Sequence, residues 1–326
     1  MASPHCGEVL RLLFRVKLVS VQGTRKENGV TDSEHGAVPG ESTTRAARSA
    51  AFLKQVAISG AAARRRLTSI ALRPIYAFYL TRLRAEVMRH PRPRHVAVIM
   101  DGNRRWAASV GLSTDAGHRA GAETALDLVD WCATAGIGEL TVWALSLENL
   151  GRSEAEVGTI SDVAAEALNA IRSGKRRTTV PIRLHVIGRT DLLPESLRES
   201  TTGSRRLSSD DASMQVTVAI GYSGRDEIVE ATRAAVRELV GDGISPAELP
   251  DRLTPEAIER HLYTAGSSDP DLIIRTSGEV RLSGFLPWQS VHSEFYFCDV
   301  YWPAFREIDF LRAIRTYQHR SRRFGR

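Results

Sequence analysis

The sequence predicts an α/β fold: a single domain with a central, mostly parallel sheet flanked by helices, plus an N-terminal extension. From His95 onward, short apolar runs alternate with amphipathic helical segments, which is typical of a parallel sheet covered on both faces. Arginines, hydroxyl residues and glycines follow several of these runs. The first part of the chain is basic and lacks this alternation. We therefore expect residues 1–70 to form a basic extension, partly disordered or helical, and residues 71–326 to form the main domain.

The extension carries the positive charge of the chain. Residues 1–90 hold 15 basic and 6 acidic residues, a net charge of +9, whereas the remainder holds 29 and 32, a net charge of −3. A slightly acidic body argues against a nucleic-acid-binding protein. The extension is compatible with a membrane surface or another acidic partner. Arg45–Arg89 has a helical pattern, and this basic amphipathic helix could lie on a membrane or pack on the domain with its basic face in water.

We predict a cytoplasmic protein, with peripheral contact at the inner face of the plasma membrane as an alternative for the extension. The apolar stretch Val9–Val21 is too short to span a membrane, is interrupted by basic residues, and lacks the features of a signal peptide. Cysteine usage argues against a disulfide framework or a zinc cluster, because the count is odd and no CxxC pair occurs. The three cysteines are Cys6, Cys132 and Cys298.

The elements of the main domain follow from the hydrophobic periodicity. The predicted strands are His95–Met100, Leu140–Leu145, Ile182–Ile187, Val216–Ile220, Leu272–Ile274 and Phe295–Phe297. The predicted helices between them include Ala120–Ala135, Glu154–Arg172, Arg225–Val240 and Pro255–Tyr263.

The residues that follow the strands indicate the ligand. In parallel α/β sheets, ligands bind at the carboxyl ends of the strands. Guanidinium groups and open backbone N–H groups beside glycine suit a ligand with several phosphate oxygens. The segments concerned are Asp101–Trp106, Ser146–Asn149 with Arg152, Gly221–Arg225, and Arg275–Glu279 with Arg281 and Ser283.

Two residues near the first strand have both a structural and a functional interpretation. Asp101 could cap the following helix, as could Asn103, or it could bind Mg²⁺ and a diphosphate beside two arginines. His118 lies at a predicted helix start, where it could donate to a phosphate oxygen or serve as a surface or capping residue.

The fifth strand leads to a second candidate region. Arg275 and Arg281 follow an apolar strand, so we favour phosphate binding for their loop over a solvent-exposed charge run. Glu294 lies in an apolar-rich stretch, where it is a candidate second acid for the metal or the partner of an arginine in a salt bridge. Other sites are excluded: the sequence has no P-loop, no G-x-G-x-x-G after the first strand, no G-x-S-x-G elbow and no aspartate-rich DDxxD helix.

Taken together, these motifs resemble the undecaprenyl diphosphate synthase, or cis-prenyltransferase, family. The resemblance spans Leu72 to Arg326, and the segments Leu262–Phe285 and Leu72–Arg84 are most similar to actinobacterial short-chain Z-farnesyl diphosphate synthases. The motifs that carry it are VIMDGNRRWA (Val98–Ala107), GHRAGAE (Gly117–Glu123), SLENLGR (Ser146–Arg152) and IRTSGEVRLSGFLPWQ (Ile274–Gln289).

The resemblance implies a homodimeric transferase that condenses isopentenyl diphosphate with an allylic diphosphate. It implies that Asp101 and Glu294 bind Mg²⁺ and that Asp101 helps the allylic diphosphate leave. Asn149, with Ser146 near the reacting centre, stands in the position often assigned to proton removal. Because an amide is a poor base, we interpret Asn149 as positioning the proton path. The C-terminal Arg323–Phe324–Gly325 matches an element that reaches the partner's site. The residues implied to cradle the allylic diphosphate are Gly102, Asn103, Arg104, Arg105 and His118. Those implied to bind isopentenyl diphosphate are Arg275, Arg281 and Ser283. Further residues counted in the substrate site are Trp106, Thr114, Leu147, Glu148, Leu150, Arg152 and Leu282.

Three departures from the family pattern bear on substrate preference. Thr114 stands where most members have an arginine, Leu150 replaces a tryptophan, and Val280 replaces a polar residue. Ala144 is small, which favours a longer product if it lines the hydrocarbon tunnel. The leading hypothesis is a short-chain Z,E-farnesyl-type synthase that uses geranyl diphosphate. A long-chain polyprenyl diphosphate synthase and a non-catalytic subunit of a prenyltransferase complex are the alternatives.

Overall fold

The computed structural model describes residues 73–173, 180–202 and 212–320. The predicted extension 1–70 lies outside the described residues, as do Arg323–Phe324–Gly325 and the predicted helix before Arg73.

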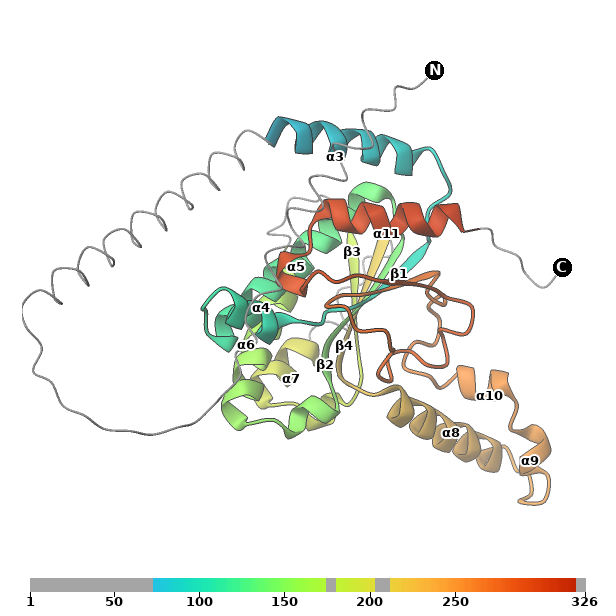
Figure 1. The fold of residues 1–326 in the computed structure, drawn as a ribbon. Helices are drawn as coiled ribbons and strands as arrows, with labels where there is room; N and C mark the ends of the chain where they lie inside the picture. Colours follow the sequence, from blue (N-terminus) through green and yellow to red (C-terminus); the bar gives the residue numbers. More distant parts are fainter. Residues whose placement is uncertain (1–72, 174–179, 203–211, 321–326) are drawn as a thin grey trace, which may run out of the picture. The chain divides into compact units, whose positions relative to one another are not determined.

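All six described strands are parallel and form one sheet in the order β3-β4-β2-β1-β5-β6 (Figure 1). Each predicted strand is present within two residues of its expected ends. The α/β fold with a central parallel sheet is therefore confirmed. The strands are β1 (His95–Ile99), β2 (Glu139–Ser146), β3 (Ile182–Ile187), β4 (Met214–Tyr222), β5 (Leu272–Arg275) and β6 (Glu294–Phe297).

Helices precede, connect and follow the strands. The longer ones are α3 (Arg73–Met88), α5 (Thr114–Ala135), α6 (Glu154–Arg172), α8 (Gly224–Gly241) and α11 (Glu307–His319). The shorter ones are α4 (Asn103–Ser109), α7 (Glu195–Thr202), α9 (Leu249–Arg252) and α10 (Pro255–Glu259), with 3₁₀ turns at Glu148–Gly151, Thr190–Leu192 and Trp302–Ala304. None of the helices in the described part of the chain is long and apolar enough to cross a membrane.

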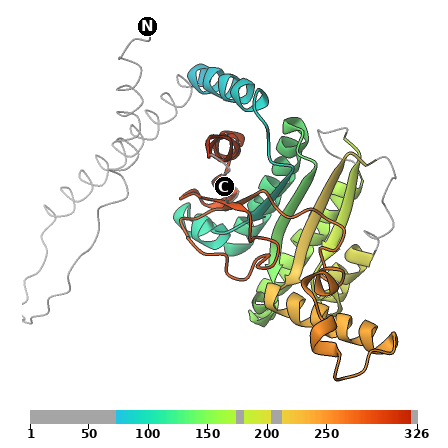
Figure 2. The same ribbon diagram turned by 90° about the vertical axis from the view of Figure 1, so that its right-hand side faces the viewer.

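Successive side chains of each strand point to opposite faces of the sheet, and apolar side chains cover both faces. Val96 and Val98 point into the larger apolar cluster, which includes residues of α5, α6, α11 and α3. Ala97 and Ile99 point into a smaller cluster on the other face, formed with the segment that follows β5. Figure 2 shows the strands of the sheet side by side. Both faces are therefore apolar, and polar side chains are left for the strand ends.

Two helix boundaries differ from the prediction. The α5 helix begins at Thr114, because the Ser113 hydroxyl caps it by accepting a hydrogen bond from the Ala116 N–H (3.2 Å). His118 consequently lies in the second turn rather than at the helix start. The α10 helix ends at Glu259, and the turns after it bring Tyr263 against Tyr222 of β4, with ring centroids 6.5 Å apart.

The end of β2 is irregular. Its pairing with β4 shifts register between Trp143 and Leu145 and again between Leu145 and Ser146. Such a bulge lets a strand re-aim the residues at its end. Here it affects Ala144 and Ser146, which both line the cleft described next.

Candidate active site

A cleft lies at the carboxyl ends of β1, β2, β4 and β5, where the sequence placed the ligand. Among the described residues, six arginines and two carboxylates line it. This excess of positive charge fits a polyanionic ligand. The predicted site residues that line the cleft are Asp101, Gly102, Asn103, Arg104, Arg105, His118, Ser146, Glu148, Asn149, Arg152, Arg275, Arg281 and Ser283.

Asp101 lies between two arginines. Its Oδ2 accepts a hydrogen bond from Arg275 (2.9 Å), and its Oδ1 accepts one from Arg105 (2.9 Å). Burial alone would raise the pKa of this carboxyl, but the hydrogen bonds and charges of Arg275 and Arg105 outweigh it and hold the pKa below its usual range. The side chain makes no capping bond to α4, so the capping interpretation of Asp101 is wrong. Asp101 is therefore ionised and oriented at neutral pH.

Gly102 gives Asp101 its position. It is the residue that precedes α4, with a left-handed φ of 107° that other residues rarely adopt. A Cβ at this position would lie 2.8 Å from the Tyr301 ring and 3.0 Å from the Cβ of Ser277. A larger residue would therefore separate Asp101 from the loop that carries Arg275 and Ser277.

The loop after β5 is held by strained serines. Ser277 and Ser283 both have positive φ values, 75° and 53°. The hydroxyl of Ser277 accepts a hydrogen bond from Arg105 (2.6 Å), and that of Ser283 accepts one from Arg275 (2.9 Å). Non-glycine residues in this conformation cost about 1–3 kcal/mol each and cluster at functional sites. The loop thus uses backbone strain to fix two guanidinium groups on either side of Asp101.

A second cluster of charged and polar side chains surrounds Glu156. Its members Arg104, Arg152 and His118 line the cleft, and we call these three residues the mouth of the cleft. One carboxylate oxygen of Glu156 accepts a hydrogen bond from Arg152 (2.8 Å) and lies 3.8 Å from Arg104 and 3.6 Å from Nε2 of His118. Burial lowers the pKa of His118, and the Glu156 charge only partly opposes this effect. His118 is therefore neutral near pH 7 and can donate a single N–H.

The segment after β2 contributes polar groups between these two regions. The Ser146 hydroxyl accepts a hydrogen bond from the Asn149 backbone N–H (3.1 Å). This contact fixes the 3₁₀ turn Glu148–Gly151, so that Glu148 and Asn149 line the cleft.

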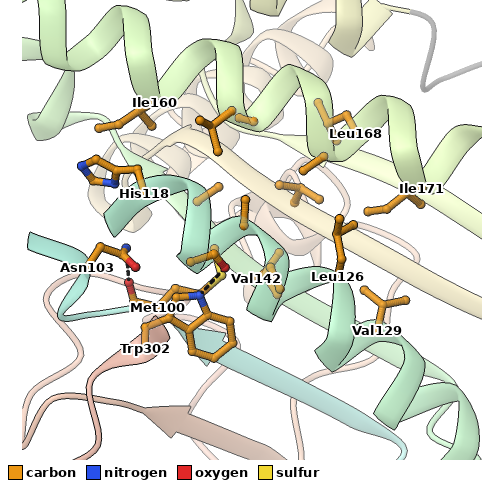
Figure 3. Close-up of a pocket in the computed structure, with 18 of the residues that line it drawn as sticks. Met100, Asn103, His118, Leu126, Val129, Val142, Ile160, Leu168, Ile171 and Trp302 are labelled. Atoms are coloured by element: carbon orange, nitrogen blue, oxygen red, sulfur yellow. Dashed lines mark hydrogen bonds between the residues drawn. The ribbon is translucent and has the colours of Figure 1, made fainter. Parts of the chain in front are cut away.

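An apolar cavity opens beside the polar cleft. Figure 3 shows His118 and Asn103 at one end of it and Leu168 and Ile171 at the other, between α5, α6 and the sheet. Small residues line much of its length: Ala122, Ala125, Ala144, Ala164 and Ala167. The residues that line both the cavity and the cleft are Met100, Asn103, His118, Ala144 and Ile160. The site is therefore shaped for a molecule with an anionic head and an apolar tail.

Glu294 and Asp101 do not lie together in the described chain. Glu294 begins β6 and pairs in register with Leu272, at the opposite end of β5 from Arg275. Its carboxylate accepts a hydrogen bond from Arg320 (2.5 Å), as the salt-bridge interpretation expected. Within the described ranges, no group of three or more histidine, cysteine, aspartate or glutamate side chains could hold a metal. The register of β6 keeps Asp101 and Glu294 apart within the described chain.

Five other predicted site residues do not line the cleft. Thr114 is exposed on the first turn of α5. Leu150 and Leu282 pack on the two apolar clusters, and Trp106 and Leu147 are half-buried beside the site.

Two segments that the sequence placed near the ligand contribute further residues: Ser223 and Arg225 line the cleft after β4, and Glu279 accepts a hydrogen bond from Arg281 (2.5 Å). Sequence reasoning missed Glu156, which pairs with cleft residues. Its position four residues after Arg152 was a usable signal.

A cleft lined by arginines beside an apolar cavity fits a ligand with an anionic head and an apolar tail, and the comparisons with known proteins show the class of protein. The family model described as "Putative undecaprenyl diphosphate synthase" matches residues 99–325. This chain belongs to that family and is a prenyl transferase.

Relatives of two kinds are found. The chain is 48% identical over 263 residues to an isoprenyl transferase of Thermus thermophilus, covering 80% of this chain and 99% of that protein. It is 47% identical over 257 residues to a (2Z,6E)-farnesyl diphosphate synthase of Thermobifida fusca, covering 77% and 97%. The crystal structure of lavandulyl diphosphate synthase from Lavandula x intermedia, in complex with dimethylallyl diphosphate, matches with a TM-score of 0.67 and 36% identity, over 74% of this chain and all of that chain.

Proposed function

We propose that the protein condenses isopentenyl diphosphate with an allylic diphosphate, geranyl diphosphate being favoured, to form a Z double bond with release of diphosphate. The observation that carries this proposal is the junction of the cleft and the cavity. Ala144 lines both the cleft that contains Asp101 and the arginines and the adjoining apolar cavity.

The two charged groups of the cleft match the two diphosphates. The mouth formed by Arg104, Arg152 and His118 adjoins the cavity, so it suits the allylic diphosphate, whose hydrocarbon tail can enter there. Arg275, Arg281 and Ser283, on the far side of Asp101, suit isopentenyl diphosphate. Holding two anionic substrates in one geometry supplies much of the acceleration in such a reaction.

Asp101 would hold Mg²⁺ together with the phosphates. Magnesium typically binds one or two protein carboxylates plus substrate phosphate oxygens, so a single ionised aspartate beside arginines fits this metal only when a diphosphate is present. Bound there, the metal would stabilise negative charge on the leaving diphosphate. Arg105 and Arg275, which hold Asp101 in place, would stabilise the same charge.

The chain offers a proton path rather than a strong base. Condensation through an allylic cation ends with loss of a proton from the isopentenyl unit. Asn149 is a poor base, so we assign it the role of positioning that unit, with a phosphate oxygen as the proton acceptor. Glu148, on the same turn, lines the cleft as well.

Two observations point to different product lengths. The similarity to the Thermobifida fusca enzyme favours a short Z,E-farnesyl-type product. The five alanines that line the cavity favour a longer polyprenyl product, because small side chains leave room for the tail. We keep the short product as the leading proposal and the long one as the second candidate.

The wider assignments rest on the resemblance. We propose a homodimer and a cytoplasmic location. Light scattering on the purified protein tests the first assignment.

The central claim is tested by Asp101→Ala, with Asp242→Ala as the control at an exposed helix end. The purified protein with Mg²⁺ and labelled isopentenyl diphosphate should give product, and the Asp101 variant should lose nearly all turnover while it keeps its melting temperature within a few degrees. Near-normal turnover of Asp101→Ala would remove the claim. An inactive wild-type protein would support a non-catalytic subunit.

Product analysis separates the two lengths. Incubation with geranyl or farnesyl diphosphate should give a single C15-type product from the former. A series of progressively longer products would contradict the short-chain proposal.

A further inference from the structure

The outer face of α3 has no role in the site. The inner face of the helix is fixed: Leu83 and Val87 are buried, Arg84 donates to Glu307 (3.0 Å), and Gln318 donates to the Val87 carbonyl (2.9 Å). Figures 1 and 2 both show α3 beside α11. These contacts leave the opposite face of α3 uncovered by the rest of the described chain.

That outer face is apolar and cationic. Phe78 is 69% exposed and Ile75 is 61% exposed, which makes them two of the most exposed large apolar residues of the described chain. Phe78 and Arg82 are four residues apart on one stripe of α3, and Arg89 directly follows the last residue of the helix, Met88. In the described part of the chain, neither Arg82 nor Arg89 is in an ion pair. A phenylalanine followed by unpaired arginines is typical of a surface that meets anionic lipid.

The charge of the whole body is segregated toward this end. Among the described residues, 73–90 hold four basic and one acidic residue, and 306–320 hold four and two, which gives a combined charge of +5. The described residues between 91 and 305 hold 17 basic and 28 acidic residues, a charge of −11. An anionic surface would therefore attract the end with α3 and α11 and repel the rest.

We propose that the outer face of α3 docks the enzyme on an anionic membrane surface, with Phe78 and Ile75 inserted at the interface and Arg82 and Arg89 against lipid phosphates. Charge favours this occupant over the others. A second copy seated on the same face by two-fold symmetry would set these arginines against their own equivalents. The segment 1–72 holds 11 basic and 5 acidic residues, so it is itself positively charged. Docking would hold the enzyme at the surface into which an amphiphilic product partitions.

The test uses the full chain and sedimented vesicles of two compositions, phosphatidylglycerol mixed with phosphatidylcholine, and phosphatidylcholine alone. We expect binding to the anionic vesicles only, weakened by high salt. Phe78→Ser should lower the partition coefficient at least about tenfold. The pair Arg82→Gln and Arg89→Gln should lower it about five-fold per charge. Val240→Ser, at an exposed position of α8 on the acidic part of the chain, should change nothing.

Three outcomes would overturn the proposal. Equal vesicle binding by the wild type and Phe78→Ser would place the contact elsewhere. Absence of vesicle binding would mean that the face is covered. A dimer that Phe78→Ser dissociates in sedimentation equilibrium would assign the face to a second copy. Turnover of substrates in detergent should be unchanged in all these variants, which separates this test from that of the proposed reaction.

Discussion

Replacing Gly117 by alanine should push apart α4 and α5, which form the side of the cleft that we propose for the allylic diphosphate. Gly117 is buried in α5 where that helix crosses α4, and a Cβ there would lie 2.6 Å from the Asn103 backbone oxygen and 2.9 Å from the Cβ of Ala107. Ordinary contact begins at 3.4 Å, so the helices must move apart by about 0.8 Å, the difference between 3.4 and 2.6 Å. The Asn103 oxygen belongs to the backbone, so no change of side-chain rotamer can relieve the contact.

The cost follows from two opposing effects. Overpacking of this kind destabilises by about 1–3 kcal/mol, whereas alanine in a helix interior is about 1 kcal/mol better than glycine. We therefore expect Gly117→Ala to lower the free energy of unfolding by no more than about 2 kcal/mol. Activity should suffer more, because α4 carries Arg104 and Arg105, and a misplacement of about 1 Å can cost about 100-fold in rate.

The assay is kcat/KM for both diphosphates, with thermal unfolding measured alongside. Gly158→Ala is the matched control, because Gly158 also lies inside a helix, α6, and a Cβ there would meet nothing within 4 Å. It should be as active as the wild type and up to about 1 kcal/mol more stable. If Gly117→Ala turns over as fast as Gly158→Ala, the crossing of α4 and α5 does not position the site.

Two further predictions concern buried and half-buried carboxylates. Burial raises the pKa of Glu227, which accepts a hydrogen bond from the Tyr222 hydroxyl (2.6 Å), so its stabilising contribution is present below its usual pKa and is lost as pH rises through the raised value. Glu227→Gln should thus gain stability relative to the wild type from pH 4 to 8 in denaturant titrations, and a constant difference would contradict this. Glu156→Gln should raise KM for the allylic substrate roughly 3- to 10-fold, since Arg152 loses a charge-assisted hydrogen bond of about 1 kcal/mol or more. Glu166→Gln loses only a surface ion pair with Arg119, so it should leave this KM unchanged. Equal KM values for the two variants would show that Glu156 does not orient the residues of the mouth.

The strands and the polar residues after them could be predicted because both depend on local pattern. Ile182–Ile187 and Glu154–Arg172 were placed to the residue, since each has a clear period and clear ends. Asp101 could be placed beside the other cleft residues because the carboxyl ends of parallel strands meet at one edge of the sheet. Pairings that depend on tertiary contacts were harder to predict.

Glu294 illustrates that limit. Its sequence neighbourhood indicated a buried acid, but only the register of β6 against β5 shows that it lies at the other end of the strand from Arg275. The hydrogen bond between Trp302 and the Gly121 carbonyl (2.8 Å), two residues that line the apolar cavity, likewise joins residues 181 positions apart. No periodicity carries such information.

The irregularity in β2 has a consequence for how this protein can diversify. Ala144 lies within the bulge, off the regular ladder, and borders both the polar cleft and the apolar cavity. If the proposed function holds, a larger side chain at that point would shorten the space for the tail without disturbing the pairing of β1, after which Asp101 lies. Tail length and bond-forming chemistry would then be separable traits, and a lineage could change one by single substitutions while it inherits the other intact.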